Sequence, residues 1–113
     1  MASRRGQIWW VDFTAGRGSE QSGLRPAVVI QNDIGNEYSS TTIVAAVSAS
    51  PPKRVYPFQV LLPPGEAGLS QPSVVKCDQV LTVDQGRLRR LAGTLTPPQL
   101  REVDAALRRS LGL

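Results

Sequence analysis

The sequence predicts an α+β fold in which a small, strongly curved antiparallel β-sheet or SH3-like barrel is followed by one α-helix. Short apolar segments recur along the chain between turn residues, and only the last segment has a clear helical period. The 113 residues leave room for one compact core, and no repeat or linker divides them. We therefore expect residues 1–113 to form a single domain.

The predicted strands are rich in β-branched and aromatic residues, and they are 7–13, 25–31, 41–48, 56–62 and 73–83, with a further short strand at 90–95. Four successive apolar residues in the second strand indicate burial on both faces. Pro57 places the start of the fourth strand at a sheet edge. The fifth strand is long, and we expect it to bend near Asp78 or Gln79.

The connections are expected at residues 14–23, a long polar loop, and at the turns 32–36 and 84–86. The C-terminal helix begins after Thr96, which forms a capping box with Gln99 and has Pro97 in the first turn. Gly112 ends the helix. Its apolar stripe consists of Leu100, Val103, Leu107 and Leu111.

Composition excludes several kinds of chemistry. The chain contains no histidine and one cysteine, Cys77, so it lacks the usual zinc ligands, an intrachain disulfide and histidine-based catalysis. We therefore expect no metal or other cofactor. Because no apolar run approaches the ~18 residues of a membrane span, and residues 1–5 do not lead into a secretory signal, we expect a cytoplasmic protein.

A net charge of +4 with a pI near 10.0 favours a polyanionic partner. Several of the cations fall between Arg87 and Arg109, where a solvated helix face explains them at least as well. The charge alone is a weak indication of nucleic-acid binding.

Four polar residues are candidates for a site, and each also has an ordinary structural explanation. Arg25 follows the polar loop directly, where it is able to bind a phosphate or to pair with Glu20. Ser48 ends a strand, where its hydroxyl contacts either a phosphate or the backbone. Lys76 and Asp78 share one strand face and serve either as a charged pair in a site or as a surface ion pair.

The aromatic residues also leave alternatives open. Trp9 and Trp10 point to opposite faces of one strand, so at least one belongs to the core and the other either packs or stacks on a base. Tyr56 and Phe58 share a strand face and are candidates for base stacking.

These residues lie in an ordered series of motifs, RGQIWWVD at 5–12, GSEQ at 18–21, RPAVVIQN at 25–32 and CDQ at 77–79. The series closely resembles the MazF/PemK toxins, and similarity covers nearly the whole chain. The resemblance implies a CcdB/MazF-type barrel, a homodimer whose groove holds single-stranded RNA, and cleavage of mRNA or rRNA at a short sequence. It also implies a cognate MazE-like antitoxin as a partner.

The resemblance assigns roles to individual residues. Arg25 and Ser48 match the family's catalytic pair, although Thr is usual at the second position. Lys76 and Asp78 match a basic residue and an acidic residue before the DQ motif, where Arg is common in place of Lys76. The resemblance also implies substrate binding by Ser19, Glu20, Gln21 and Gln79.

With neither metal nor histidine, the RNA's own 2'-hydroxyl is the expected nucleophile, giving a cyclic phosphate and a free 5'-hydroxyl. The group that takes the 2' proton stays open: Glu20 or Asp78 are candidates, and Arg25 only in an unusual environment. Two alternatives are a DNA gyrase poison of the same fold, which should lack the GSEQ and RP motifs, and a non-catalytic nucleic-acid-binding module.

Overall fold

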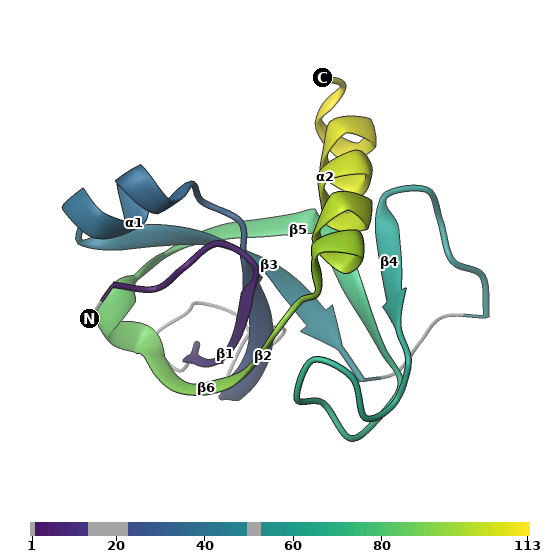
Figure 1. The fold of residues 1–113 in the computed structure, drawn as a ribbon, viewed down its shortest axis with the longest axis horizontal. Helices are drawn as coiled ribbons and strands as arrows, with labels where there is room; N and C mark the ends of the chain where they lie inside the picture. Colours follow the sequence, from purple (N-terminus) through teal and green to yellow (C-terminus); the bar gives the residue numbers. More distant parts are fainter. Residues whose placement is uncertain (1, 14–22, 50–52) are drawn as a thin grey trace.

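The computed structural model describes residues 2–13, 23–49 and 53–113 (Figure 1). The elements, in chain order, are β1 (Gln7–Asp12), β2 (Leu24–Val29), α1 (Asp33–Tyr38), β3 (Thr41–Ser48), β4 (Gln59–Leu62), β5 (Ser73–Asp84), the 3-10 helix η1 (Gln85–Arg87), β6 (Leu88–Thr94) and α2 (Pro97–Leu111). None of the helices in these ranges is both long and apolar enough to cross a membrane.

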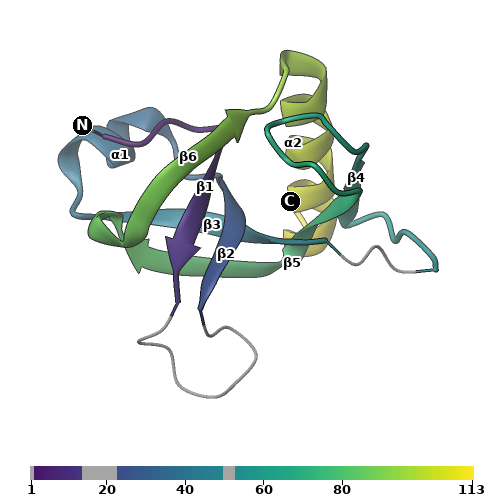
Figure 2. The same cartoon turned by 90° about the horizontal axis from the view of Figure 1, so that it is seen from below.

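The six strands form one antiparallel sheet in the order β4-β5-β3-β2-β1-β6. The sheet curves strongly, and β1 and β2 run together toward one end of the molecule (Figure 2). Register irregularities in the β1–β6 and β3–β5 pairs add local twist and bending. The predicted curved sheet with a C-terminal helix is confirmed, and β4 and β6 are its two edges. Pro57 precedes edge strand β4, as expected.

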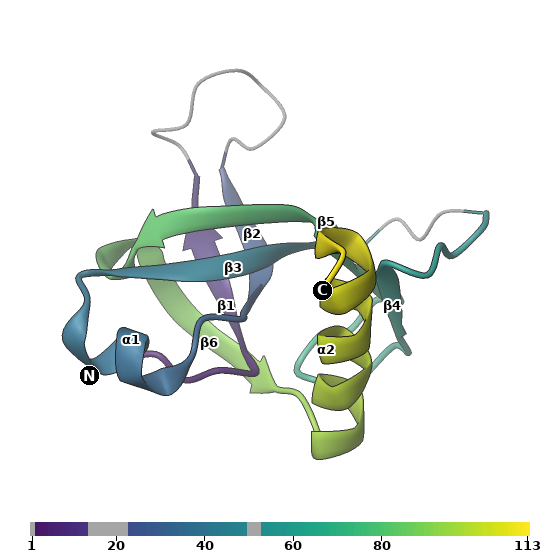
Figure 3. The same ribbon diagram turned by 90° about the horizontal axis from the view of Figure 1, so that it is seen from above.

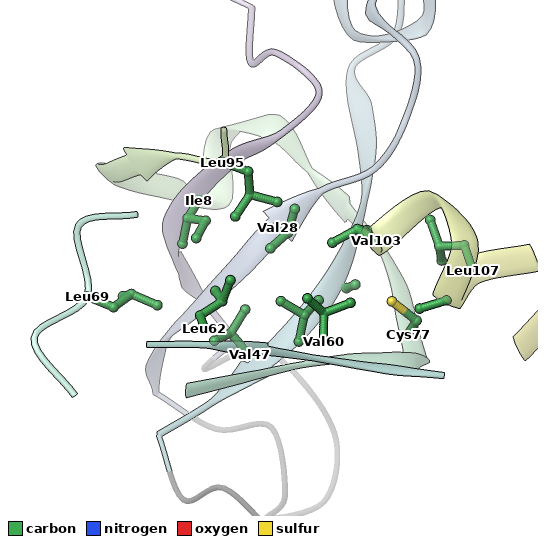
Figure 4. Close-up of a cluster of buried hydrophobic side chains, with 13 residues drawn as sticks. Ile8, Val28, Val47, Val60, Leu62, Leu69, Cys77, Leu95, Val103 and Leu107 are labelled. Atoms are coloured by element: carbon green, nitrogen blue, oxygen red, sulfur yellow. The ribbon is translucent and has the colours of Figure 1, made fainter. Parts of the chain in front are cut away.

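Both faces of the central strands are buried. Val28 packs into a main core, whereas its neighbours Ala27 and Val29 pack into a second core on the opposite face of β2. Helix α2 lies beside β4 and β5 (Figure 3) and closes the main core with Val103 and Leu107. The labelled members of the main core point toward a common interior (Figure 4): Ile8, Val28, Val47, Val60, Leu62, Leu69, Cys77, Leu95, Val103 and Leu107.

Helix α2 begins and ends where the sequence predicts. The Thr96 hydroxyl accepts from the backbone N–H of Gln99, the Gln99 side chain accepts from the backbone N–H of Thr96, and Gly112 has a φ of 73°. The predicted stripe is only partly buried, because Leu111 is 59% exposed. It lies in the last turn, where the helix projects beyond the strands (Figure 1).

Residues 32–36 form the start of a helix rather than a simple turn. The side chain of Asn32 accepts from the backbone N–H of Gly35 at 2.7 Å and so caps α1. The buried Asn36 side chain accepts from the Thr42 hydroxyl at 2.6 Å and donates to the Gln31 carbonyl oxygen at 3.0 Å. Asn32 therefore caps α1, and Asn36 links this segment to β3. The turn predicted at 84–86 is likewise the short helix η1.

The loop between β4 and β5 packs closely on edge strand β6. A Cβ atom added to Gly68 would overlap the carbonyl group of Ala92, and one added to Gly93 would overlap the carbonyl group of Ala67. Gly68 also has a φ of +80°, which side chains with a Cβ rarely adopt. Two glycines facing each other thus allow the backbones of this loop and β6 to meet.

We predict that Gly68→Ala destabilises the fold by about 2 kcal/mol more than Gly65→Ala, because overpacking adds to backbone strain. Gly65 is a matched control, since its φ is +84° and nothing lies within 4 Å of an added Cβ. Urea unfolding of both variants measures the difference. Equal losses of unfolding free energy would contradict the close contact.

Candidate active site at the ends of β2 and β3

Arg25 and Ser48 lie at the same end of two paired strands. Arg25 is the second residue of β2 and is exposed, whereas Ser48 is the last residue of β3 and is half-buried. Ala27 pairs with Ala46, and Arg25 and Ser48 each lie two residues from this pair at the same end of the two strands, where both line one cavity. We call this pair of strand ends the rim. A guanidinium and a hydroxyl side by side suit binding of a phosphate group.

A polar cavity of about 430 Å³ lies on one side of the rim. Its lining residues come from β2, β3 and β5, and they are Arg25, Pro26, Ala46, Val47, Ser48, Lys76, Asp78, Gln79, Val80 and Leu81. The cavity brings together Arg25, Ser48, Lys76, Asp78 and Gln79, which the sequence singled out. It joins two cations, a carboxylate, an amide and a hydroxyl.

An irregularity in β5 shapes the wall of the polar cavity. Ala45 pairs with Val80 but the next residue, Ala46, pairs with Lys76, so residues 77–79 have no partners on β3. The predicted bend near Asp78 and Gln79 is therefore confirmed. Because the bulge interrupts strict alternation, Asp78, Gln79 and Val80 all line the cavity. The two ion pairs found among the described residues join Arg5 to Asp104 and Arg89 to Asp12, so neither involves Lys76 or Asp78.

A second cavity, of about 420 Å³, also borders the rim. We call it the indole cavity, and its lining residues are Trp10, Gly23, Leu24, Arg25, Pro26, Val47, Ser48, Ala49, Gly68, Leu69, Ser70, Gln71 and Ser73. It shares Arg25, Pro26, Val47 and Ser48 with the polar cavity. Arg25 and Ser48 consequently border two cavities of different character.

The two tryptophans lie on opposite faces of β1, as the sequence predicts. Trp9 packs against the second core and donates from its indole N–H to the Gln7 side chain at 2.9 Å. Trp10 packs against the main core and lines the indole cavity. The guanidinium carbon of Arg90 lies 5.5 Å from the centre of the Trp10 ring.

Tyr56 and Phe58 line neither cavity. They precede β4, so the prediction that they belong to that strand is wrong; β4 begins at Gln59, whose side chain accepts from the Tyr56 backbone N–H at 3.0 Å in a turn. The two rings stack on each other with centres 5.5 Å apart, and Arg54 lies over the Tyr56 ring. Tyr56 is 44% exposed. Ser19, Glu20 and Gln21 lie outside the described residues.

Cys77 is not a nucleophile at neutral pH, although it lies between two residues that line the polar cavity. Its side chain is fully buried in the main core. Burial raises the pKa of the thiol to about 11, and the nearby Asp78 carboxylate adds to the rise. Within the described ranges, no group of three His, Cys, Asp or Glu side chains is placed to hold a metal ion.

The sequence analysis did not find the indole cavity. Part of its lining comes from the loop before β5, which meets β6 through the contact between Gly68 and Ala92; these residues are Gly68, Leu69, Ser70, Gln71 and Ser73. The paired small residues at Gly68 and Gly93 were the available signal, but nothing in the sequence indicates that they face each other. The stacking of Arg90 on Trp10 also depends on β1–β6 pairing, which a sequence pattern does not reveal.

Comparison with known proteins identifies the family. Residues 4–111 match the model of the PemK-like, MazF-like toxins of type II toxin-antitoxin systems. A relative from Staphylococcus saprophyticus named endoribonuclease MazF is 40% identical over 110 residues, which cover 97% of this chain and 92% of the relative.

Solved structures show the same arrangement. A crystal structure of MazF from Deinococcus radiodurans is 29% identical in sequence and superposes with a TM-score of 0.81. The match covers 100% of this chain and 99% of that chain. A chain in a MazE-MazF crystal structure from the same organism is 26% identical, with a TM-score of 0.77 and coverage of 100% and 98%. The chain belongs to the PemK-like, MazF-like toxins of type II toxin-antitoxin systems.

Proposed function

We propose that this chain, an endoribonuclease toxin by family, cuts single-stranded RNA at the rim without a metal ion. The observation that carries the proposal is that Arg25 and Ser48 lie near the ends of the paired strands β2 and β3 and border both cavities. Together they offer a fixed cation and a hydroxyl to one phosphate of a strand that crosses the rim. We further propose that residues 1–113 act as one domain in the cytoplasm.

The reaction requires little from the protein beyond orientation and charge. The 2'-oxygen gives up its proton and attacks the adjacent phosphorus, and the bond from phosphorus to the 5'-oxygen breaks. The departing 5'-oxygen takes a proton from water, so that a 2',3'-cyclic phosphate and a 5'-hydroxyl result. Arg25 stabilises the charge that grows on the phosphorane oxygens, and Ser48 holds the phosphate. The absence of histidine from the whole chain favours this route over a histidine acid–base pair.

The polar cavity supplies the remaining groups for substrate binding. Lys76 adds a second positive charge, while Gln79 offers both a donor and an acceptor to a base edge. Asp78 lines the same cavity as Arg25 and Ser48, which supports it as the acceptor of the 2' proton. Ser19, Glu20 and Gln21 are proposed as further substrate contacts on the family resemblance alone, as are Tyr56 and Phe58 on their ability to stack.

We propose two protein partners, a second copy of the chain and a MazE-like antitoxin. Two exposed apolar side chains border the cavities, Leu24 at 50% and Val80 at 38% exposure, and a second copy would cover such groups. Similarity to the MazF chain of a MazE-MazF structure supports the antitoxin.

The proposed reaction is tested with an oligonucleotide that carries the chain's own cut sequence, mapped beforehand by primer extension on a long RNA. We expect cutting in the presence of EDTA, products with a cyclic phosphate and a 5'-hydroxyl, and no cutting when the 2'-hydroxyl at the cut is replaced by hydrogen. The replaced substrate should still bind, because only the nucleophile is lost. Cleavage of this analogue, or a need for a divalent ion, would overturn the mechanism.

The protein control is a pair of arginine variants measured in the same assay. Arg25→Ala should lower kcat at least about a hundredfold, the usual effect of removing a group that stabilises developing charge. Arg101→Ala removes the same charge from an exposed position on α2 that lines neither cavity, and it should leave kcat nearly unchanged. Equal losses in both variants would mean that net charge, not position, matters.

The serine at position 48 generates a separate prediction. Ser48→Ala should reduce kcat about tenfold or more, because a hydrogen bond to a charged phosphate is lost. Ser48→Thr keeps the hydroxyl and restricts its rotamer, so its kcat should equal or exceed that of the parent chain. Single-turnover cleavage separates the two variants, and a Thr variant as slow as the Ala variant would exclude a role for the hydroxyl.

The homodimer is tested by sedimentation equilibrium. We expect a mass of about twice the 12.2 kDa of one chain, falling toward one chain when Val80 is replaced by Asp. The substitution would bury a charge if a second copy covers this position. Thr82→Asp serves as the control on the same strand, since Thr82 is exposed and lines neither cavity. A monomeric parent chain at micromolar concentration would refute the dimer.

A further inference from the structure

We propose that the indole cavity binds the base of one of the two nucleotides that flank the cut, with Trp10 as the stacking surface. The inference rests on the proposed function, since it takes Arg25 and Ser48 as the groups that hold the phosphate. It assigns the RNA a second subsite, separate from the polar cavity.

The position of the cavity is the first argument. Arg25 and Ser48 line the indole cavity as well as the polar cavity, so a phosphate bound at the rim lies at the mouth of both. A nucleotide on either side of that phosphate places its base a short distance away. A strand that crosses the rim therefore directs one neighbouring base into each cavity.

The chemistry of the lining is the second argument. Trp10 and Leu69 provide flat or apolar surfaces, and Ser70 and Gln71 provide donors and acceptors. A nucleobase has apolar faces and polar edges, so it matches this combination. An aliphatic side chain of a protein partner would leave the polar groups of the lining without a match. We therefore commit to an RNA base as the occupant.

The contact between Arg90 and Trp10 is the third argument. The guanidinium lies over the indole ring, yet Arg90 is not part of the cavity lining. Arg90 therefore contacts Trp10 without itself lining the cavity. Arg90 is exposed, and its positive charge lies over the Trp10 ring. We assign it as a positioning residue that acts through Trp10.

Glycine packing holds the cavity wall in place. Leu69 is 5% exposed and belongs to the main core, and the adjacent Gly68 meets the backbone of β6 at Ala92. Ser73 is buried, and its hydroxyl donates to the carbonyl oxygen of Gln71 at 2.9 Å. The loop residues that line the cavity are therefore held by contacts within the chain at both ends of the segment 68–73.

The test measures coupling between a base and a side chain. Oligonucleotides carrying the mapped cut sequence are made with an abasic sugar at each position near the cut, one at a time. For the parent chain, removing the base that enters the indole cavity should lower kcat/KM about tenfold, the scale of one base stacked on an aromatic ring. For the Trp10→Leu variant, removing the same base should lower kcat/KM about twofold or less.

Matched variants exclude general effects. Trp9→Leu changes the neighbouring tryptophan on the opposite face, so the tenfold penalty for the abasic sugar should persist. Arg90→Gln should raise KM for the intact substrate and leave KM for the abasic one unchanged, a split that a merely structural role would not produce. Arg89→Gln, which removes one charge from the adjacent residue, should affect both substrates alike.

A measurement without substitution of Trp10 covers the case in which its leucine variant does not fold. In the Trp9→Phe variant, tryptophan fluorescence comes from Trp10 alone, because the chain has two tryptophans. The uncleavable 2'-deoxy oligonucleotide should quench this emission, and its abasic form should quench it less. Equal quenching by the two, or an abasic penalty independent of Trp10, would overturn this subsite while leaving Arg25-dependent cleavage and the proposed function intact.

Discussion

Burial of both faces of the central strands is the constraint on which the site depends. Residues 27–29 of β2 and 44–47 of β3 are buried, and they divide between two apolar cores. An unpaired charge or hydroxyl in this region would lose its hydration without compensation. Buried polar groups on these strands therefore need a partner, as the Thr42 hydroxyl has in Asn36, whereas Arg25 on β2 and Ser48 on β3 stand where burial stops. The rigid strands then hold both groups at a fixed spacing.

The bulge in β5 lets successive residues of this strand line the polar cavity. A regular strand beside β3 would turn every second residue away from the polar cavity. Since residues 77–79 have no partners on β3, Asp78, Gln79 and Val80 all reach the cavity, while Cys77 stays in the main core. The backbone N–H of Cys77 donates to the Phe58 carbonyl oxygen at 3.1 Å, so the irregular segment remains tied to the chain before β4.

Sequence reasoning predicted the parts of this fold that depend on local pattern. The strand at 41–48 and the capping box at Thr96 and Gln99 follow from periodicity and cap chemistry, and the structure confirms them. Residues 32–36 were predicted as a turn, because asparagine favours turns and helix caps alike and the choice depends on the tie between Asn36 and Thr42. The prediction that Leu111 belongs to the buried stripe is wrong for a similar reason, since its exposure depends on how far α2 extends past the strands.

The candidate site was likewise predicted in part from local motifs. Arg25, Ser48, Lys76, Asp78 and Gln79 were found because they lie in short motifs, and the structure brings them to one cavity. Trp10 was identified only as one of two alternatives for packing or stacking. The residues that complete the indole cavity come from the loop before β5, and they meet Trp10 only because Gly68 and Gly93 allow close backbone contact. Contacts between segments so far apart in the chain depend on the whole fold, and no local pattern reveals them.

The difference between the two cavities bears on how the toxin selects its sequence. Stacking on an aromatic ring tolerates any base, because every base has a similar face, whereas hydrogen bonds to base edges distinguish one base from another. In the proposed arrangement the indole cavity contributes mainly affinity and alignment of the strand. The choice of base then falls mainly to Lys76, Asp78 and Gln79 in the polar cavity. Changes at positions 76 and 79 can thus alter the cut sequence without touching Arg25, Ser48 or Asp78, the groups proposed to perform the reaction.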